Sequence, residues 1–170
     1  MTEASINKQV KLSEHFTLGE MTKSRHTEVY NIPSHVAIEN LKRVCGWLEE
    51  LRRRYNLRYV LRSVSPPKLG GEKDTEEPII INSGYRSPQL NRKVGGSTTS
   101  NHLTGCAVDI RVAGIEQALR YAVILMDYAD ETKQDYDEIL IEKNRYGAIW
   151  VHFAVRPKDN RRKTAFCVVT

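Results

Sequence analysis

Hydrophobic positions recur at helical spacing in two long segments of the chain. Between Ser34 and Tyr55 the apolar side chains lie three or four positions apart, which predicts a helix with one buried face. Pro33 and Ser34 mark its start, and Asn56 marks its end. The residues expected on the buried face are Val36, Ile38, Leu41, Val44, Cys45, Leu48 and Leu51.

The second such segment predicts a helix over residues 115–128. A shorter helix is predicted over 87–94, where a proline follows a serine at the first helical position. Nearer the N-terminus, residues 12–22 predict a short ordered arm in which Thr17 and Glu20 form a capping box. The residues of the 115–128 helix expected to face the core are Ala118, Leu119, Ala122, Leu125 and Met126.

Short apolar runs predict strands in the rest of the chain, with a hairpin turn at 143–147. Residues 63–78, with paired prolines and paired glycines, predict a surface loop, and residues 1–10 a flexible N-terminus. Strands follow one another closely near the C-terminus, whereas helices come mainly earlier. We therefore expect a single α+β domain over 1–170, with a small antiparallel sheet flanked by helices. The predicted strands are 59–62, 78–82, 105–112, 137–142, 148–155 and 164–169.

Composition places the chain among ordinary globular proteins. It has 170 residues, of which 40% are hydrophobic and 28% charged, enough for one core. No apolar run is long enough to span a bilayer, and no signal peptide is visible, so we expect synthesis in the cytoplasm. The three cysteines form no CxxC pair, which argues against a disulfide framework.

The formal net charge of +5 comes largely from two basic clusters, residues 52–54 and 156–163. A basic surface can attract nucleic acid or an anionic polymer such as bacterial cell wall. No nucleic-acid-binding motif accompanies these charges, so we interpret both clusters as solvated surface and expect no nucleic-acid partner. We also expect a monomer.

Three residues far apart in the sequence have the side chains of a catalytic zinc site. His102, Asp109 and His152 supply two imidazoles and one carboxylate, a set that leaves the fourth tetrahedral position open. A structural zinc would instead need four protein ligands. Cys106, between the first two, is an alternative thiolate ligand, although a free cysteine is more often a small buried hydrophobe.

The residues around these ligands resemble a known family. Ser100, His102, Gly105, Ala107 and Asp109 form the pattern Ser-x-His-x-x-Gly-x-Ala-x-Asp, and Trp-x-His follows at 150–152. This combination is similar to the zinc D-alanyl-D-alanine carboxypeptidase family of metallopeptidases. The likeness is to its small single-domain branch, which includes carboxypeptidases and phage endolysins. The Asn-Ser-Gly-Tyr-Arg-Ser block at 82–87 and the N-terminal arm extend the resemblance over about residues 11–157.

The resemblance implies roles for further residues. Arg86 is expected to stabilise the developing oxyanion or to hold a substrate carboxylate; alternatively, it pairs with an acidic residue to hold its loop. Ser100 is expected to hydrogen-bond the substrate backbone. Tyr85, Gln89 and Trp150 are candidates for the substrate pocket, and Trp150 can equally be a core aromatic.

The chain departs from the family at the expected general base. Many members carry a carboxylate three residues before the last histidine, and here that residue is Ile149. Glu142 is the best substitute, because a three-residue turn at 145–147 would place it opposite Trp150 and on the same face as His152, whereas a two-residue turn would point it away. Glu138 is the second candidate and Asp137 the third.

The resemblance therefore implies a zinc-dependent peptidase that hydrolyses peptide bonds in peptidoglycan stem peptides. The bond cut is either a terminal D-Ala–D-Ala bond, as in a carboxypeptidase, or an internal one, as in an endolysin. In the second case the protein would be released to the cell wall. The alternative is a non-catalytic zinc-binding module of the same fold that binds cell wall or has a structural role.

Overall fold

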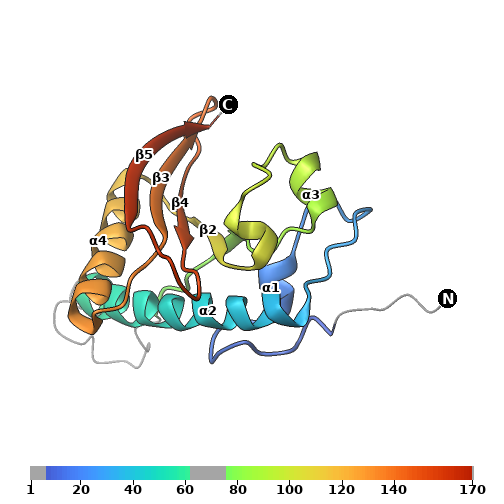
Figure 1. Cartoon of the computed structure of the whole chain (residues 1–170). Coiled ribbons are helices and arrows are strands. Elements are labelled where there is room, and N and C mark those ends of the chain that lie inside the picture. Colours follow the sequence, from blue (N-terminus) through green and yellow to red (C-terminus); the bar gives the residue numbers. More distant parts are fainter. Residues whose placement is uncertain (1–6, 62–75, 170) are drawn as a thin grey trace, which may run out of the picture.

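Five strands form one mixed sheet in the described part of the chain, residues 7–61 and 76–169 of a computed structural model (Figure 1). Their order across the sheet is β1-β2-β4-β3-β5. All neighbours run antiparallel except β3 and β5, which are parallel. The strands are β1 (Ile81–Ser83), β2 (Ala107–Arg111), β3 (Glu138–Asn144), β4 (Ile149–Ala154) and β5 (Lys163–Val169).

The structure has the α+β class expected from the sequence, but the expectation of a purely antiparallel sheet is wrong for β5. Both edges of β4 are already paired, with β2 and with β3. The chain that leaves β4 passes instead to the outer edge of β3. Because β5 starts at the end where β4 finishes, it runs opposite to β4 and parallel to β3.

Two long helices cover one face of this sheet: α2 (His35–Tyr55) and α4 (Ile115–Thr132) pack against each other and against the strands (Figure 1). The Ser34 side chain accepts a hydrogen bond from the backbone N–H of Ala37 and caps α2. Two short helices, α1 (Leu18–Thr22) and α3 (Pro88–Lys93), precede and follow β1 along the chain. The expected capping box of Thr17 and Glu20 is present at α1.

The central strands have one apolar and one polar face, because successive side chains of a strand point to opposite sides. The apolar side chains form the core beneath α2 and α4. The opposite face of the same strands carries Asp109, Glu142, Trp150 and His152. The core-facing residues of β2, β3 and β4 are Val108, Ile110, Ile139, Ile141, Val151 and Phe153.

The prediction of a strand at 59–62 is wrong for residues 59–61, the part of it that the structure describes. Residues Asn56–Val60 continue α2 as a π-helical turn, closed by the Leu61 N–H donating to the Asn56 carbonyl at 2.9 Å. The Asn56 side chain bonds Arg52 and Glu77 instead of ending the helix. A run of three apolar residues fits a helix end as well as a strand, and packing against the core decided between them.

Two residues predicted to be buried are exposed: Val36, at 70%, and Leu119, at 44%. Each lies outside the arc of its helix that meets the core, where Ala37 and Ala118 are buried instead. The expected loop over 63–78 lies outside the described residues from 63 to 75, as does the N-terminus from 1 to 6. The predicted strand at 78–82 is shorter and shifted, at Ile81–Ser83.

Acidic partners surround both basic clusters. Arg52, Arg53 and Arg54 each pair with a glutamate, and Arg156 and Arg161 both pair with Asp137.

The three cysteines are free. Among the described helices, none combines the length and hydropathy that crossing a bilayer requires.

Candidate metal centre

Three polar side chains converge on the polar face of the sheet. The structure brings together the three residues that the sequence predicted as ligands, His102, Asp109 and His152, with one ligand atom from each lying within 4.8 Å of the others. All three are buried, with 2%, 8% and 7% of their surface exposed. Their burial at one point makes this cluster the candidate site for a metal ion.

Local structure fixes the position of each of these side chains. Asp109 on β2 lies directly opposite His152 on β4, so the two side chains share a face. His102 lies in the short 3-10 helix η2 (Asn101–Thr104) that precedes β2. Gly105 ends η2 with φ 72°, and a Cβ there would lie 2.4 Å from the Ala37 carbonyl oxygen. The turn that carries His102 beside β2 therefore requires glycine.

The two imidazoles flank the carboxylate of Asp109. Its Oδ1 lies 3.0 Å from His152 Nδ1 and 3.3 Å from His102 Nε2. Burial raises the pKa of Asp109, but the neighbouring imidazoles outweigh that effect and hold it well below its usual range. Asp109 is therefore an anion at neutral pH, the form in which a carboxylate binds a cation.

The outward nitrogen of each imidazole has its own partner. His102 Nδ1 lies 2.6 Å from the carbonyl oxygen of Gly84, to which it donates, and His152 Nε2 lies 3.2 Å from Glu138 Oε2. These contacts leave His102 Nε2 and His152 Nδ1 facing Asp109. Ligating histidines in metal sites commonly donate their other ring N–H to a carbonyl or carboxylate in this way.

The residues present fit a divalent metal ion. Burial lowers the pKa of His152, but its bonds to the carboxylates of Asp109 and Glu138 outweigh that effect and raise the pKa to about 9. These two carboxylates therefore favour positive charge at His152. A metal ion would supply that positive charge between the rings. Two imidazole nitrogens and a carboxylate oxygen suit zinc among several transition metals. Cys106 is not part of the cluster, and burial raises the pKa of its thiol.

Arg86 lies against the cluster. Its Nη2 donates to Asp109 Oδ2 at 2.6 Å, and its Nε donates to the hydroxyl of Ser83 at 3.0 Å. The backbone N–H of Arg86 donates to the His102 carbonyl. Arg86 therefore pairs with Asp109, which is itself a candidate metal ligand. The guanidinium lies beside the candidate site, whether it holds its loop in place or contacts the substrate.

Glu142 occupies the position expected from a three-residue turn. It pairs directly with Trp150 across β3 and β4, and its side chain is on the same face as His152. Its Oε2 accepts a hydrogen bond from the Trp150 indole N–H at 2.6 Å. Burial raises the pKa of Glu142 above its usual value, which suits a group that must take up a proton. Ile149 packs against the core.

The two other candidate bases are engaged elsewhere. Glu138 contacts His152 Nε2, on the side of the ring away from Asp109, and this contact holds the pKa of Glu138 down to about 2. Asp137 is fully buried and binds Arg161, Arg156 and Asn101. Glu142 is therefore the candidate base that the geometry favours.

The predicted pocket residues divide into two groups. Ser100 and Trp150 line cavities beside the cluster, and the Ser100 hydroxyl also accepts a hydrogen bond from the backbone N–H of His102. Tyr85 is buried in the hydrophobic core, and Gln89 is exposed on α3. Neither of these two lines the cavities described below.

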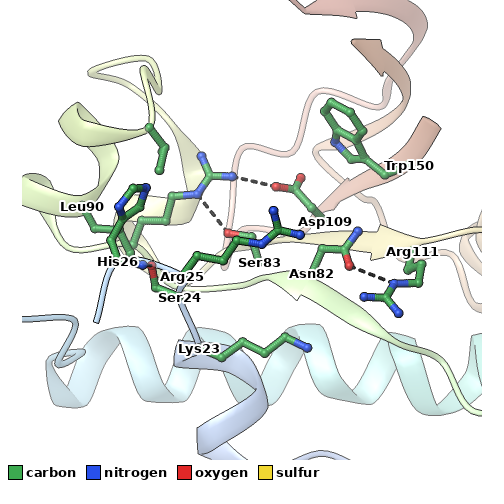
Figure 2. A pocket seen from close by; sticks show the side chains of 12 residues that line it. Lys23, Ser24, Arg25, His26, Asn82, Ser83, Leu90, Asp109, Arg111 and Trp150 are labelled. Atoms are coloured by element: carbon green, nitrogen blue, oxygen red, sulfur yellow. Dashed lines mark hydrogen bonds and ion pairs between the residues drawn. The ribbon is translucent and has the colours of Figure 1, made fainter. Parts of the chain in front are cut away.

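Two cavities of about 670 and 640 Å³ meet at the cluster. Arg86, Val94, Asp109 and Trp150 line both of them. The first, shown in Figure 2, extends toward the segment after α1 and is the arm cavity hereafter. The second extends over Glu142 and the loop at 95–101 and is the loop cavity.

Several basic residues that line the arm cavity were not predicted from the sequence, namely Lys23, Arg25 and Arg111. Lys23 and Arg25 lie in the segment that continues the N-terminal arm past Thr22, and Arg111 lies at the far end of β2. Only the folded arrangement brings these two segments together, so no local spacing in the sequence could indicate it. The alternation along β2 places Arg111 on the same face as Asp109, which was the one available signal.

A comparison with protein families supports a peptidase. The family model described as Peptidase M15 matches residues 71–134, a segment that includes His102 and Asp109 but not His152. No curated protein matches the chain. Together with the His-Asp-His cluster, the family match supports a metal-dependent peptidase.

Proposed function

We propose that this protein is a zinc-dependent peptidase that hydrolyses peptide bonds in the stem peptides of peptidoglycan. The observation that carries the proposal is the convergence of His102, Asp109 and His152 at the junction of two cavities, beside Arg86 and Glu142. The match to the peptidase family supports it. The cell-wall substrate rests on the motif resemblance, and with that substrate we propose that the protein acts at the cell wall.

Zinc would be held by His102 Nε2, Asp109 and His152 Nδ1. When bound, it supplies a Lewis acid for the scissile carbonyl and lowers the pKa of a water molecule. Glu142 takes a proton from the attacking water and returns it to the leaving amine. The indole N–H of Trp150 fixes one carboxylate oxygen of Glu142 and leaves the other for this transfer.

Arg86 supplies positive charge next to the reacting centre. Its bonds to Asp109 and Ser83 fix the guanidinium before substrate binds, so little reorganisation is needed. We infer that it stabilises the oxyanion that develops on the scissile carbonyl. Ser100, at the start of η2, lies in the loop cavity where it can bond the peptide backbone.

Digestion of purified peptidoglycan tests the proposal. Mass spectrometry of the products should show cleaved stem peptides, and a chelator should abolish the cleavage. Glu142→Gln should lower kcat by roughly 10²-fold or more with zinc content unchanged, which is the usual contribution of a general acid–base group. Glu39→Gln, on the exposed surface of α2, is the matched control and should keep full activity.

One observation favours a second function. Ile149 occupies the position of the usual catalytic carboxylate and packs against the core, as expected of a non-catalytic metal-binding module that binds cell wall. Such a module would contain stoichiometric zinc and bind peptidoglycan without cleaving it. That result in the digestion experiment would replace the peptidase proposal.

A further inference from the structure

The arm cavity has an excess of positive charge. Lys23, Arg25, Arg86 and Arg111 line it, and Asp109 is the one carboxylate among the described residues of its lining. The loop cavity is balanced: Arg86, Arg161 and Lys163 line it with Asp109, Glu138 and Glu142. The two sides of the candidate metal centre therefore differ in charge, and a substrate lying across it would meet positive charge on one side.

Three of these cations have no acidic partner in the region that the structure describes. Among the described residues, neither Lys23 nor Arg25 has an ion-pair partner, and the Arg111 guanidinium donates to the side-chain oxygen of Asn82, at 3.2 Å. The arginines of the two basic clusters, by contrast, pair with carboxylates: Arg52, Arg53, Arg54, Arg156 and Arg161. Unpaired cations that share a concave surface favour an anionic ligand.

The arm that carries Lys23 and Arg25 is held in place beside the metal ligands. Asn31 donates to the carbonyl oxygens of Thr22 and Tyr85, and its own oxygen accepts from the backbone N–H of Ser87. The Tyr85 N–H donates to the carbonyl of Met21. These bonds join the arm to the segment that ends in Arg86, so the basic residues belong to the same rigid surroundings as the candidate site.

Figure 2 shows how the cations lie. Arg25 extends from the arm over Ser83, Lys23 lies below it, and Arg111 approaches from β2 beside Asn82. Asp109 and Trp150 lie above them in this view. A planar guanidinium matches the geometry of a carboxylate, and a lysine adds a point charge.

We propose that Lys23, Arg25 and Arg111 form a subsite that binds a carboxylate of the peptide substrate, next to the bond to be cut. The inference rests on the proposed peptidase function and narrows its substrate to stem peptides with a free carboxylate. Two sources supply that group: the C-terminus of the peptide, or the α-carboxylate of an internal, γ-linked glutamate. Arg86 remains with Asp109 and is not part of this subsite.

Binding of three synthetic peptides tests the subsite. The first is the stem peptide L-Ala–γ-D-Glu–L-Lys–D-Ala–D-Ala, the second is its C-terminal amide, and the third carries an amide at the internal α-carboxylate. Affinity is measured by calorimetry on the zinc-loaded Glu142→Gln protein, with mass spectrometry showing that the peptides stay intact. One of the two amides should bind at least about 10-fold more weakly than the parent peptide, which identifies the carboxylate that is bound.

Matched variants separate a local site from overall charge. The double variant Lys23→Ala, Arg25→Ala should bind the parent peptide only as tightly as the wild type binds the weaker amide. Arg111→Ala should also lower the affinity for the parent peptide. Arg145→Ala with Lys158→Ala removes the same charge from outside both cavities and should leave all three affinities unchanged. Circular dichroism checks that each variant is folded.

Two results would overturn the subsite. Both amides could bind as tightly as the parent peptide, or the Arg145 and Lys158 variant could weaken binding as much as the arm variant. Failure of the peptidase proposal is seen separately, in the digestion of peptidoglycan. Selective binding without cleavage would leave the subsite standing and remove the peptidase, whereas cleavage without selectivity would remove only the subsite.

Discussion

At the scale of single residues, the candidate centre depends on which nitrogen each histidine presents. His102 Nδ1 bonds the carbonyl of Gly84, and His152 Nε2 lies against Glu138. Each contact turns the opposite ring nitrogen toward Asp109. The two histidines thus use different nitrogens, and the orientation of His152 depends on a single side chain from the neighbouring strand.

Glu138→Gln should weaken zinc binding by about 10–100-fold, the usual effect of losing a charged partner of a ligating histidine. The amide keeps the size of the side chain but loses the negative charge that orients the ring and makes it more basic. Competition with a coloured chelator measures the affinity. Glu39→Gln is the control, and equal zinc affinity in Glu138→Gln and the wild type would show that Glu138 does not support His152.

At the scale of elements, Asp137 joins the segments that surround the site. Its carboxylate accepts two side-chain bonds from Arg161 and one from Asn101, the residue before His102. It also pairs with Arg156, after β4. Burial raises the pKa of Asp137, but these partners outweigh it and lower the pKa from 3.8 to about 2. The contribution of Asp137 to stability is therefore present above pH 4 and is lost as the pH falls toward 2.

Asp137→Asn should lower the free energy of unfolding by about 2 kcal/mol at pH 7, because an amide carries no charge and replaces one of the two acceptor oxygens that bind Arg161 with an NH2 donor. Urea unfolding at several pH values measures the effect. The difference between variant and wild type should shrink below pH 4, as the wild-type carboxyl takes up its proton. A difference that does not change with pH would contradict the assigned role of the charge.

The sequence predicted some of these helices, strands and turns, but not others. Helical spacing was enough to predict α2 and α4, whereas the sequence left the length of the turn before β4 open, and the structure has the three-residue turn that places Glu142 opposite Trp150. The prediction of a strand at 59–62 failed because three consecutive apolar residues are too few to show a periodicity. The parallel pairing of β5 and the basic lining of the arm cavity depend on which distant segments meet, and no local pattern carries that information.

At the scale of the whole molecule, the candidate metal centre joins segments that are distant in sequence. Its ligands come from η2, β2 and β4, and Asp109 and His152 are held opposite each other by strand pairing. These atoms converge only in the folded chain. A metal that binds the folded state and not the unfolded one stabilises the fold by mass action.

Zinc at 100 times its dissociation constant should therefore raise the free energy of unfolding by about 2.7 kcal/mol. For a chain of this size, the melting temperature should rise by roughly 5–10 °C and return on addition of a chelator. His152→Ala should abolish this response, because it removes one of the three ligands. His35→Ala, at the exposed start of α2, should keep it. A melting temperature that zinc and chelator both leave unchanged in the wild type would mean that the three side chains do not form a metal site.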